Sequence, residues 1–383
     1  MAERVAVISA DNILSPLGFN TSDNYNAVKN NLSCLRLYGP DWGVSDSFVA
    51  ALINHDDVLS ECEAEGISEG YTFFEKMAIL SIRKTLCQCQ IDITSERTLV
   101  IISSTKGNID LLCRKPDNIA DDQVMLGEAA KAIATNVGNP NQPIVISNAC
   151  ISGASSQITA ARLIKAGYYD HVIVCGIDVL TPFVVSGFQS LKALTDKPCR
   201  PFDEERTGIN LGDAASTIIY SSKEKKDLKH GDWYLEAGAI RNDAYHISSP
   251  SNKGEGCYRA LRQILQNQDL GDIAFINAHG TATLFNDEME SVAIDRAGLN
   301  AIPVNSLKGY FGHTMGAAGV LETIISKCAL NEGVILPTKG YENLGVSKKI
   351  VVTSQMVETN KQSFIKMMSG FGGCNAAILF KRY

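Results

Sequence analysis

Short apolar runs alternate with longer amphipathic runs along almost the whole chain. Residues 97–104, 143–147 and 171–178 are rich in valine and isoleucine without polar alternation. This pattern is typical of strands that are covered on both faces. Between them, residues 73–89 and 155–167 space their apolar side chains as amphipathic helices do. The alternation therefore predicts a layered α/β protein.

A charged stretch a little past the middle of the chain divides this pattern into two halves. Residues 220–232, "YSSKEKKDLKHGD", are interpreted as a solvated connector. The strand and helix pattern restarts after them. The chain of 383 residues is long enough for one large domain or two of medium size. We predict two halves, residues 1–225 and 226–383.

The two halves also show similar patterns of apolar strands, loops and small-residue helices. Residues 97–107 and 272–282 each form an apolar strand that opens into a small polar turn. Residues 143–167 and 302–330 each form a strand, a short loop and a helix rich in small residues. A duplicated α/β unit would place the corresponding strand-end loops around one cleft. Three residues with chemical potential lie on such loops: Cys150, His279 and His313.

Composition and charge exclude several classes of protein. The net charge of −7 argues against a nucleic-acid binder. No apolar segment is long enough to span a bilayer, and the start "MAERVAVISA" does not resemble a secretory signal. The eleven cysteines are scattered and odd in number, which favours reduced thiols in a cytoplasmic protein. Cys87 and Cys89 are one residue apart with no matching second pair, so the spacing typical of a zinc site is absent.

Cys150 lies at the point where an apolar strand gives way to a helix, in "ISNACISGASS". It can be a small buried side chain or a nucleophile. A helix N-terminus would favour the thiolate and lower the thiol pKa below its reference value of about 8.5. Ser152, Gly153 and Ala154 are small enough to let a substrate chain or another backbone come close. This position sets Cys150 apart from the other cysteines.

Two of the six histidines occupy equivalent strand-end loops. Taken alone, His279 could equally be a core histidine. His313 follows Lys308 by five residues and lies next to a predicted helix start. Two neutral imidazoles beside a thiol could donate hydrogen bonds to an enolate or oxyanion. The glycine-rich turn at residues 370–373 could aim backbone N–H groups at the same ligand.

Together these segments resemble the β-ketoacyl-[acyl carrier protein] synthases, the decarboxylating condensing enzymes of the thiolase fold. The resemblance is to the elongating branch with a Cys-His-His triad. It implies an α/β, thiolase-like fold with a duplicated five-layered α-β-α-β-α architecture and two pseudo-symmetric halves. The motifs that carry it, in order, are "LSPLG", "SNACISGA", "RPFDEERTGINLGDAASTIIY", "NDAYHISSP", "NAHGTAT", "SLKGYFGHTMGAAG" and "GFGGCNAAILF".

The resemblance implies a role for each residue of the site. Cys150 would accept the acyl group, and His279 and His313 would bind the malonyl thioester and promote its decarboxylation. Lys308 would tune the charge and orientation of the histidines. The backbone N–H groups of Cys150 and Phe371 would form the oxyanion hole, and Phe371 would gate acyl entry.

The resemblance also implies supporting residues and partners. Asp287 and Glu290 would support the catalytic residues without contacting the substrate. Thr281 and Thr283 would line the channel that holds the pantetheine arm. No metal or organic cofactor is expected beyond the phosphopantetheine of an acyl carrier protein. The expected partners are that carrier protein and malonyl and acyl thioesters. A homodimer is the default expectation, with a heterodimer containing a second synthase-like chain as the alternative.

Departures from the family pattern leave alternatives open. Residues 114–137 look abbreviated, Ile151 is bulkier than usual, and Leu284 stands where proline is common. These departures put the acyl substrate in doubt and are compatible with polyene or polyketide building. Cys374 replaces a threonine and raises the alternative of a thiolase that uses coenzyme A esters. A chain-length-factor-like partner subunit is the other alternative, but the intact triad argues against it.

An acidic carrier protein would dock on a basic surface near the pocket mouth. Lys192, Lys197 and Arg200 are candidates for that surface. An ordinary solvated surface is the competing interpretation of all three.

Overall fold

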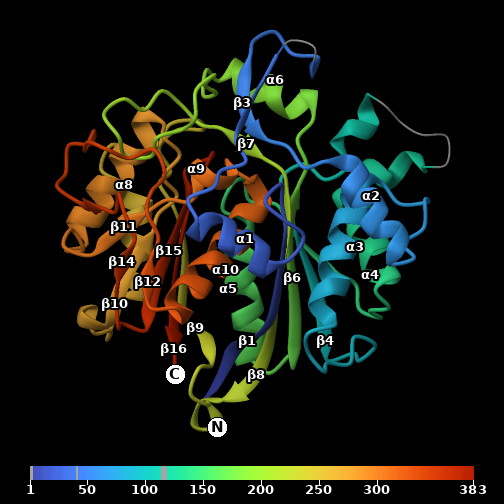
Figure 1. Cartoon of the computed structure of the whole chain (residues 1–383). Coiled ribbons are helices and arrows are strands. Elements are labelled where there is room, and N and C mark those ends of the chain that lie inside the picture. The colour runs from blue at the N-terminus through green and yellow to red at the C-terminus, as the bar shows by residue number, and fades with distance from the viewer. Residues whose placement is uncertain (1–2, 40–41, 114–118) are drawn as a thin grey trace.

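A computed structural model describes residues 3–39, 42–113 and 119–383 (Figure 1). Within these residues, eleven strands form one continuous sheet. The first half of the chain contributes β1 (Arg4–Leu14), β4 (Thr98–Ser103), β5 (Ile144–Ile146), β6 (His171–Asp178) and β8 (Ala214–Glu224). The second half contributes β9 (Trp233–Asn242), β10 (Ile273–Asn277), β11 (Pro303–Asn305), β13 (Val351–Val352), β15 (Ser363–Gly370) and β16 (Cys374–Arg382).

The five-strand order of the first half is repeated in the second half, which adds β13 at its outer edge. The order β1-β8-β6-β4-β5 is matched by β9-β16-β15-β10-β11. In both, the first two pairings are antiparallel and the next two are parallel. The halves join where β1 pairs with β9 through Ala6 with Leu235 and Val7 with Tyr234. The duplication predicted from the sequence is therefore visible in the strand order.

The two halves of the sheet form two layers, and helices between them and outside them form the other three. The helices α5 (Ser152–Lys165) and α10 (Ala318–Asn331) pack on each other and contact strands of both halves. On the outer face of the first half lie α3 (Phe73–Leu86) and α4 (Leu126–Asn136); α7 (Glu255–Ile264) and α8 (Leu284–Arg296) lie outside the second. Figure 1 shows α5 and α10 in the middle, with α3 and α8 on opposite sides.

The remaining elements connect or flank these layers. They are the helices α1 (Thr21–Lys29), α2 (His55–Ala64), α6 (Pro182–Ser190) and α9 (Lys308–Phe311), and the short strands β2 (Arg36–Tyr38), β3 (Phe48–Ala51), β7 (Leu211–Gly212), β12 (Val334–Ile335) and β14 (Val357–Glu358).

Glycines allow the two central helices to approach closely. A β-carbon on Gly153 would lie 2.8 Å from the Gly316 oxygen, and one on Gly319 would lie 2.5 Å from the Ala154 nitrogen. Both separations are too short for any larger residue. The small residues after Cys150 therefore accommodate another backbone, which is one of the two uses that the sequence suggested.

The alternating pattern predicted the main elements correctly, with one exception. The first five residues of the charged stretch, 220–224, are not connector but the end of β8. Tyr220 is fully buried and donates a hydrogen bond of 2.8 Å to Gln157. The boundary expected between residues 225 and 226 falls in the link from β8 to β9 and stays a prediction. In the segment interpreted as abbreviated, residues 114–118 lie outside the described residues and 126–136 form α4.

Among the helices described, none combines the length and the hydropathy needed to cross a bilayer. All eleven cysteines lie in the described ranges and are free thiols.

Candidate active site

A strained turn presents Cys150 to the interior. β5 ends at Ile146, and α5 begins at Ser152 with Ile151 as its N-cap residue, so Cys150 immediately precedes the N-cap. Ala149 has a φ of 45°, which is unfavourable for a residue with a β-carbon. The Ser152 hydroxyl donates to the Ala149 oxygen at 2.6 Å and fixes this turn. Ile151 is buried in the main core cluster, so its bulk packs in the core.

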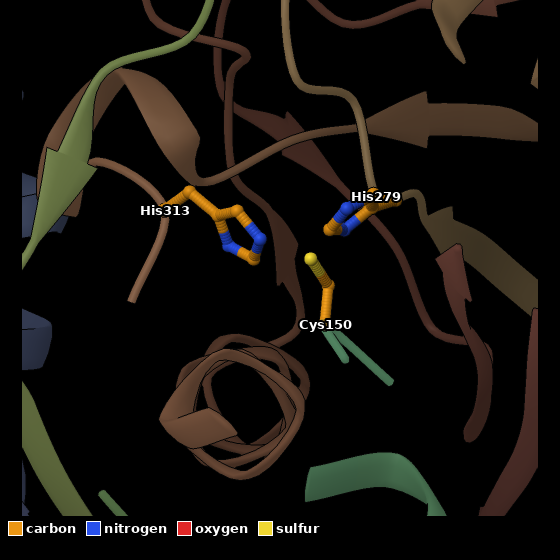
Figure 2. Close-up of side chains that lie close together, drawn as sticks. All are labelled: Cys150, His279 and His313. Atoms are coloured by element: carbon orange, nitrogen blue, oxygen red, sulfur yellow. The ribbon is translucent and has the colours of Figure 1, made fainter. Parts of the chain in front are cut away.

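Cys150 meets both predicted histidines (Figure 2). The sulfur and one nitrogen of each imidazole lie within 4.8 Å of one another, and all three residues are buried. The rings of His279 and His313 are 4.9 Å apart at an interplanar angle of 83°. Tertiary structure thus brings together three groups that are separated by 129 and 34 residues in sequence.

Two acidic residues of α8 hold the loop that carries His279. Glu290 accepts hydrogen bonds from the backbone N–H groups of His279 at 2.8 Å and Gly280 at 2.7 Å. Asp287 accepts from the backbone N–H of Thr281 at 3.0 Å. Burial raises the pKa of Asp287 to about 6 and also raises the pKa of Glu290. These contacts fix the backbone of His279 and of the two residues that follow it.

A backbone donor determines the tautomer of His313. The N–H of Met315 donates to His313 Nδ1 at 3.3 Å, so the proton of the neutral ring resides on Nε2. Within the described residues, His313 Nε2 and His279 Nδ1 are buried and have no hydrogen-bond partner. A buried polar atom without a partner is costly, and a ligand can satisfy it. Each histidine therefore offers a free ring nitrogen.

Two buried lysines share one carboxylate behind the histidines. Lys308, in α9, and Lys366, in β15, are fully buried and both bind Glu322 of α10. The Lys366–Glu322 distance is 2.5 Å. Since two cations share one anion, this group carries a net positive charge.

Burial and this charge keep the histidines neutral. Desolvation, followed by the charge of Lys308, lowers the pKa of both His279 and His313 well below the ordinary value of 6.5. Lys366 lowers both further. Neutral imidazoles are what the hydrogen-bonding role inferred from the sequence requires.

The thiol pKa of Cys150 differs from the sequence-based prediction. Desolvation, aided by nearby Cys374, raises it to about 12, and the opposing effects of Lys308, Lys106 and the Phe371 N–H are smaller. The expectation of a lowered thiol pKa is therefore wrong, because burial outweighs the predicted effect of the helix N-terminus. The reason is that Cys150 is only 7% exposed, and burial removes the water that would solvate a thiolate.

The glycine turn places backbone donors beside the nucleophile. The Phe371 backbone N–H is one of the groups that oppose the raised pKa of the Cys150 thiol. A β-carbon on Gly370 would lie 3.1 Å from the Cys150 nitrogen and 3.2 Å from the Ala149 β-carbon. Glycine at this position therefore leaves room beside the Cys150 N–H. The Phe371 ring is 38% exposed and packs against Phe188 of α6 with centroids 5.9 Å apart.

A cavity of about 330 Å³ leads to these residues. Besides the triad, Thr281, Thr283 and Phe371 line it, and the two threonine hydroxyls are 2.9 Å apart. Leu284, at the start of α8, also lines the cavity and is 60% exposed. The effect of Leu284 on the choice of acyl substrate stays a prediction.

The three basic docking candidates have different surroundings. Lys192 is exposed and lines the cavity. Lys197 is exposed but does not line it. Arg200 is not a free surface cation, because it forms ion pairs with Asp203 at 3.0 Å, Glu342 at 3.4 Å and Glu205 at 3.8 Å. These ion pairs make Arg200 less available than Lys192, and a docking role for any of the three stays a prediction.

Cys374 lies beside the site but has partners of its own. Its thiol donates to the Phe371 oxygen at 3.2 Å and approaches the Asn148 oxygen at 3.8 Å. Burial raises its pKa to about 11. These features indicate a packed thiol.

The triad is also a set of potential metal ligands. One thiol and two imidazoles are donors typical of zinc. However, Lys308 and Lys366 place a net positive charge behind the histidines. That charge disfavours a bound cation, and the absence of a metal site stays a prediction.

Sequence reasoning missed three residues of the site. Glu322 and Lys366 complete the charged group, and the Asn210 backbone oxygen accepts from the His313 N–H at 2.7 Å. The signal for the first two was present: each is a lone charge in an otherwise apolar helix or strand, in "GVLETIIS" and "SFIKMMSG". A charge in such a position is expected to be buried with a partner.

Comparison with known proteins gives consistent matches. Family models described as "Beta-ketoacyl synthase, N-terminal domain" and "Beta-ketoacyl synthase, C-terminal domain" match residues 70–226 and 234–342. The "3-oxoacyl-[acyl-carrier-protein] synthase 2" of Rhizobium meliloti is 31% identical over 276 residues, covering 68% of this chain and 65% of the relative. A putative mitochondrial 3-oxoacyl-[acyl-carrier-protein] synthase of Schizosaccharomyces pombe is 26% identical over 421 residues, covering 98% and 99%.

Solved structures share the fold over the whole chain. A β-ketoacyl synthase from Burkholderia phymatum has a TM-score of 0.85 at 22% identity, covering 100% of both chains. The ketosynthase ApeO of Xenorhabdus doucetiae, solved in complex with its chain length factor, has a TM-score of 0.83 at 22% identity, covering 99% of this chain and 98% of its own. The expected thiolase-like fold is thereby confirmed.

Proposed function

The chain belongs to the β-ketoacyl synthase family, and we propose that Cys150, His279 and His313 carry out its condensation reaction. The enzyme is an acyltransferase that forms a 3-oxoacyl thioester. The observation that supports these residues is the convergence of one thiol and two neutral imidazoles, each with a free ring nitrogen, at the end of a cavity.

The first proposed step is acyl transfer to Cys150. The sulfur attacks the carbonyl carbon of an acyl thioester, and the bond between that carbon and the carrier sulfur breaks. The thiol proton ends on the released carrier thiol. The N–H groups of Cys150 and Phe371 stabilise the tetrahedral oxyanion. Because burial raises the pKa of the Cys150 thiol, we propose that the thiol loses its proton only once the acyl donor is bound.

The second proposed step is decarboxylation and condensation. The bond between the carboxylate and the α-carbon of the malonyl thioester breaks and CO₂ leaves. The free nitrogens of His279 and His313 stabilise the resulting enolate oxygen by hydrogen bonding. The enolate carbon attacks the Cys150 thioester, the carbon–sulfur bond breaks, and Cys150 leaves as a thiolate that takes up a proton from water. The product is two carbons longer and stays on the carrier.

The proposed partner is an acyl carrier protein whose phosphopantetheine arm enters along Thr281 and Thr283. Those threonines line the cavity, and Lys192 at the same cavity offers a cation to an acidic carrier. No resident cofactor is required by these steps. Free thiols at all eleven cysteines fit the proposed cytoplasmic location.

A dimer is the proposed assembly. β5 lies at one edge of the sheet, and its residues Ile144, Val145 and Ile146 are only partly buried. Apolar side chains on an unpaired edge favour pairing with a second chain. Sedimentation of the purified chain at twice its monomer mass would support a homodimer. A monomer that becomes active only with a second synthase-like chain would favour the heterodimer.

Intact-mass spectrometry with a panel of acyl-carrier thioesters tests the proposed function. We expect an acyl adduct that maps to Cys150 and disappears in Cys150→Ala, and the preferred acyl group will indicate the substrate class. Loss of acyl loading should reach about a thousandfold or more. The matched control is Cys374→Ala, because Cys374 is a buried thiol beside the same turn. Acylation of Cys374 instead would favour the thiolase alternative.

A further inference from the structure

Lys366 is a buried cation that the steps above do not use. It lies in β15, next to β10, whose end leads to His279. Its side chain is fully buried, and its ammonium group binds Glu322 at 2.5 Å. Burying a lysine is costly unless its charge has a compensating role or partner.

The carboxylate of Glu322 already has another partner. Lys308 binds its other oxygen from α9. Either lysine alone would neutralise Glu322, so the second lysine adds a positive charge that Glu322 does not compensate. In a buried site such a charge acts strongly on its neighbours.

Lys366 also contacts the backbone that leads into the catalytic loop. Its ammonium group donates to the Asn277 and Ala278 oxygens, each at 3.4 Å. These are the two residues that precede His279. The same side chain is therefore linked both to the charge behind the histidines and to the backbone position of one of them.

We propose that Lys366 is a positioning residue of the condensation reaction, which holds the chain before His279 and adds a buried positive charge behind His279 and His313. This charge has two effects. It keeps both imidazoles unprotonated, and it stabilises the negative charge that develops on the enolate. The inference rests on the proposed roles of the two histidines.

The titratable groups around Lys366 determine the sign of its pH dependence. Those that interact with it come from α10, α9, α8 and the two catalytic loops: Glu322, Lys308, Glu290, His279 and His313. Desolvation lowers the pKa of Lys366 below that of ordinary lysine, and Glu322 opposes this effect. As the pH rises through the lowered pKa, the cation is lost and stabilisation of the enolate falls.

The two histidines determine how the reaction depends on pH on the acid side of its profile, because they must stay unprotonated. Protonation of His313 at Nδ1 would set two donors against each other, because the Met315 N–H already donates to that atom. Loss of the Lys366 charge removes one of the groups that lower the pKa of His279 and His313. Both histidines would then become protonated at a higher pH than in the wild type.

The experiment measures CO₂ release from malonyl carrier thioester as a function of pH in a Cys150→Ala background, where the thiol no longer titrates. In Lys366→Gln, which keeps a hydrogen-bond donor without the charge, we expect release to fall about tenfold. The acid limb should move up by about one pH unit. Lys366→Met should show the same shift in the limb, because it lacks the same charge.

The matched control is Lys361→Gln. Lys361 also donates to a β10 backbone oxygen, that of Ile273 at 3.0 Å, but at the far end of the strand. We expect its rate and pH profile to match the background protein. A wild-type rate and acid limb in Lys366→Gln, or an equal shift in Lys361→Gln, would overturn the inference.

A measurement that needs no substitution at Lys366 covers the case in which its variants fail to fold. In the Cys150→Ala protein with Lys366 intact, CO₂ release should fall as the pH rises, at a pH below the ordinary pKa of lysine. A flat profile there would overturn the inference, whereas a protein that released no CO₂ at any pH would overturn the proposed function as well.

Discussion

The rings of His279 and His313 lie 4.9 Å apart and nearly perpendicular to each other, at 83°. Asp287 and Glu290 hold the loop of the first, whereas Asn210 and Met315 hold the second. The two rings are therefore oriented independently and converge on one sulfur. The proposed roles assign decarboxylation to these two rings and acyl loading to Cys150.

Replacing either histidine should impair decarboxylation more than loading. In His313→Phe the free Nε2 donor is lost, and we expect CO₂ release from malonyl carrier thioester to fall by about a hundredfold or more. Acyl loading of Cys150, measured by intact mass, should fall much less, because the N–H groups of Cys150 and Phe371 remain. His230→Phe, outside the site, is the control. The opposite order of effects would contradict the assigned roles.

The raised thiol pKa predicts slow alkylation of Cys150 in the free protein. A thiol whose pKa is about 12 is ionised to only about one part in ten thousand at pH 8. Labelling by iodoacetamide, followed by peptide mapping, should therefore rise about tenfold per pH unit up to the highest pH tested. The exposed thiol of Cys87 should react far faster at pH 8. A labelling rate at Cys150 that levels off near neutral pH would show that the thiolate is already formed.

A single methyl group should disrupt the oxyanion hole. The β-carbon of Gly370→Ala would lie 2.9 Å from the Cys374 sulfur and 3.1 Å from the Cys150 nitrogen, so the turn must shift. We expect kcat to fall by about a hundredfold, the usual cost of losing one oxyanion donor. In the control Gly187→Ala, the new β-carbon would meet nothing within 4 Å. Equal activity of the two variants would count against this oxyanion hole.

Glu322→Gln should destabilise the protein, because two buried lysines lose their shared anion. We expect the free energy of unfolding to fall by about 3–5 kcal/mol, measured by denaturant unfolding at pH 7. Breaking the surface pair of Lys226 and Glu224 with Lys226→Gln should cost far less stability, because solvent screens that pair. An equal loss of stability in the two variants would mean that the ion pairs of Glu322 with Lys308 and Lys366 contribute little to stability.

The pH dependence of that loss has a defined sign. Lys308 and Lys366 overcome desolvation and lower the pKa of Glu322 below its ordinary 4.5. Its carboxylate therefore contributes stability that is fully present above pH 4.5 and is lost as the pH falls through the lowered value. The difference between wild type and Glu322→Gln should shrink below pH 4.5. A difference that grows in acid would contradict this direction.

Local patterns were sufficient to predict the main strands and helices. The valine- and isoleucine-rich runs became β4 and β6, and the amphipathic runs became α3 and α5. They failed where polar residues continue a strand, as at residues 220–224. There the chain stays in β8 because it pairs with β1 along its length. Pairing with a distant strand leaves little signal in local composition.

The sequence by itself determined the layered α/β class, the duplicated order of elements and the three residues most suited to chemistry. It could do so because periodicity, glycine and the position of a polar residue after an apolar strand all act locally. Only the tertiary structure decided the charge state of the site. Burial raises the thiol pKa of Cys150. Glu322 and Lys366, which lie on elements distant in sequence, determine the charge near the histidines. Desolvation and Coulomb interactions depend on distances in space, which the order of residues does not contain.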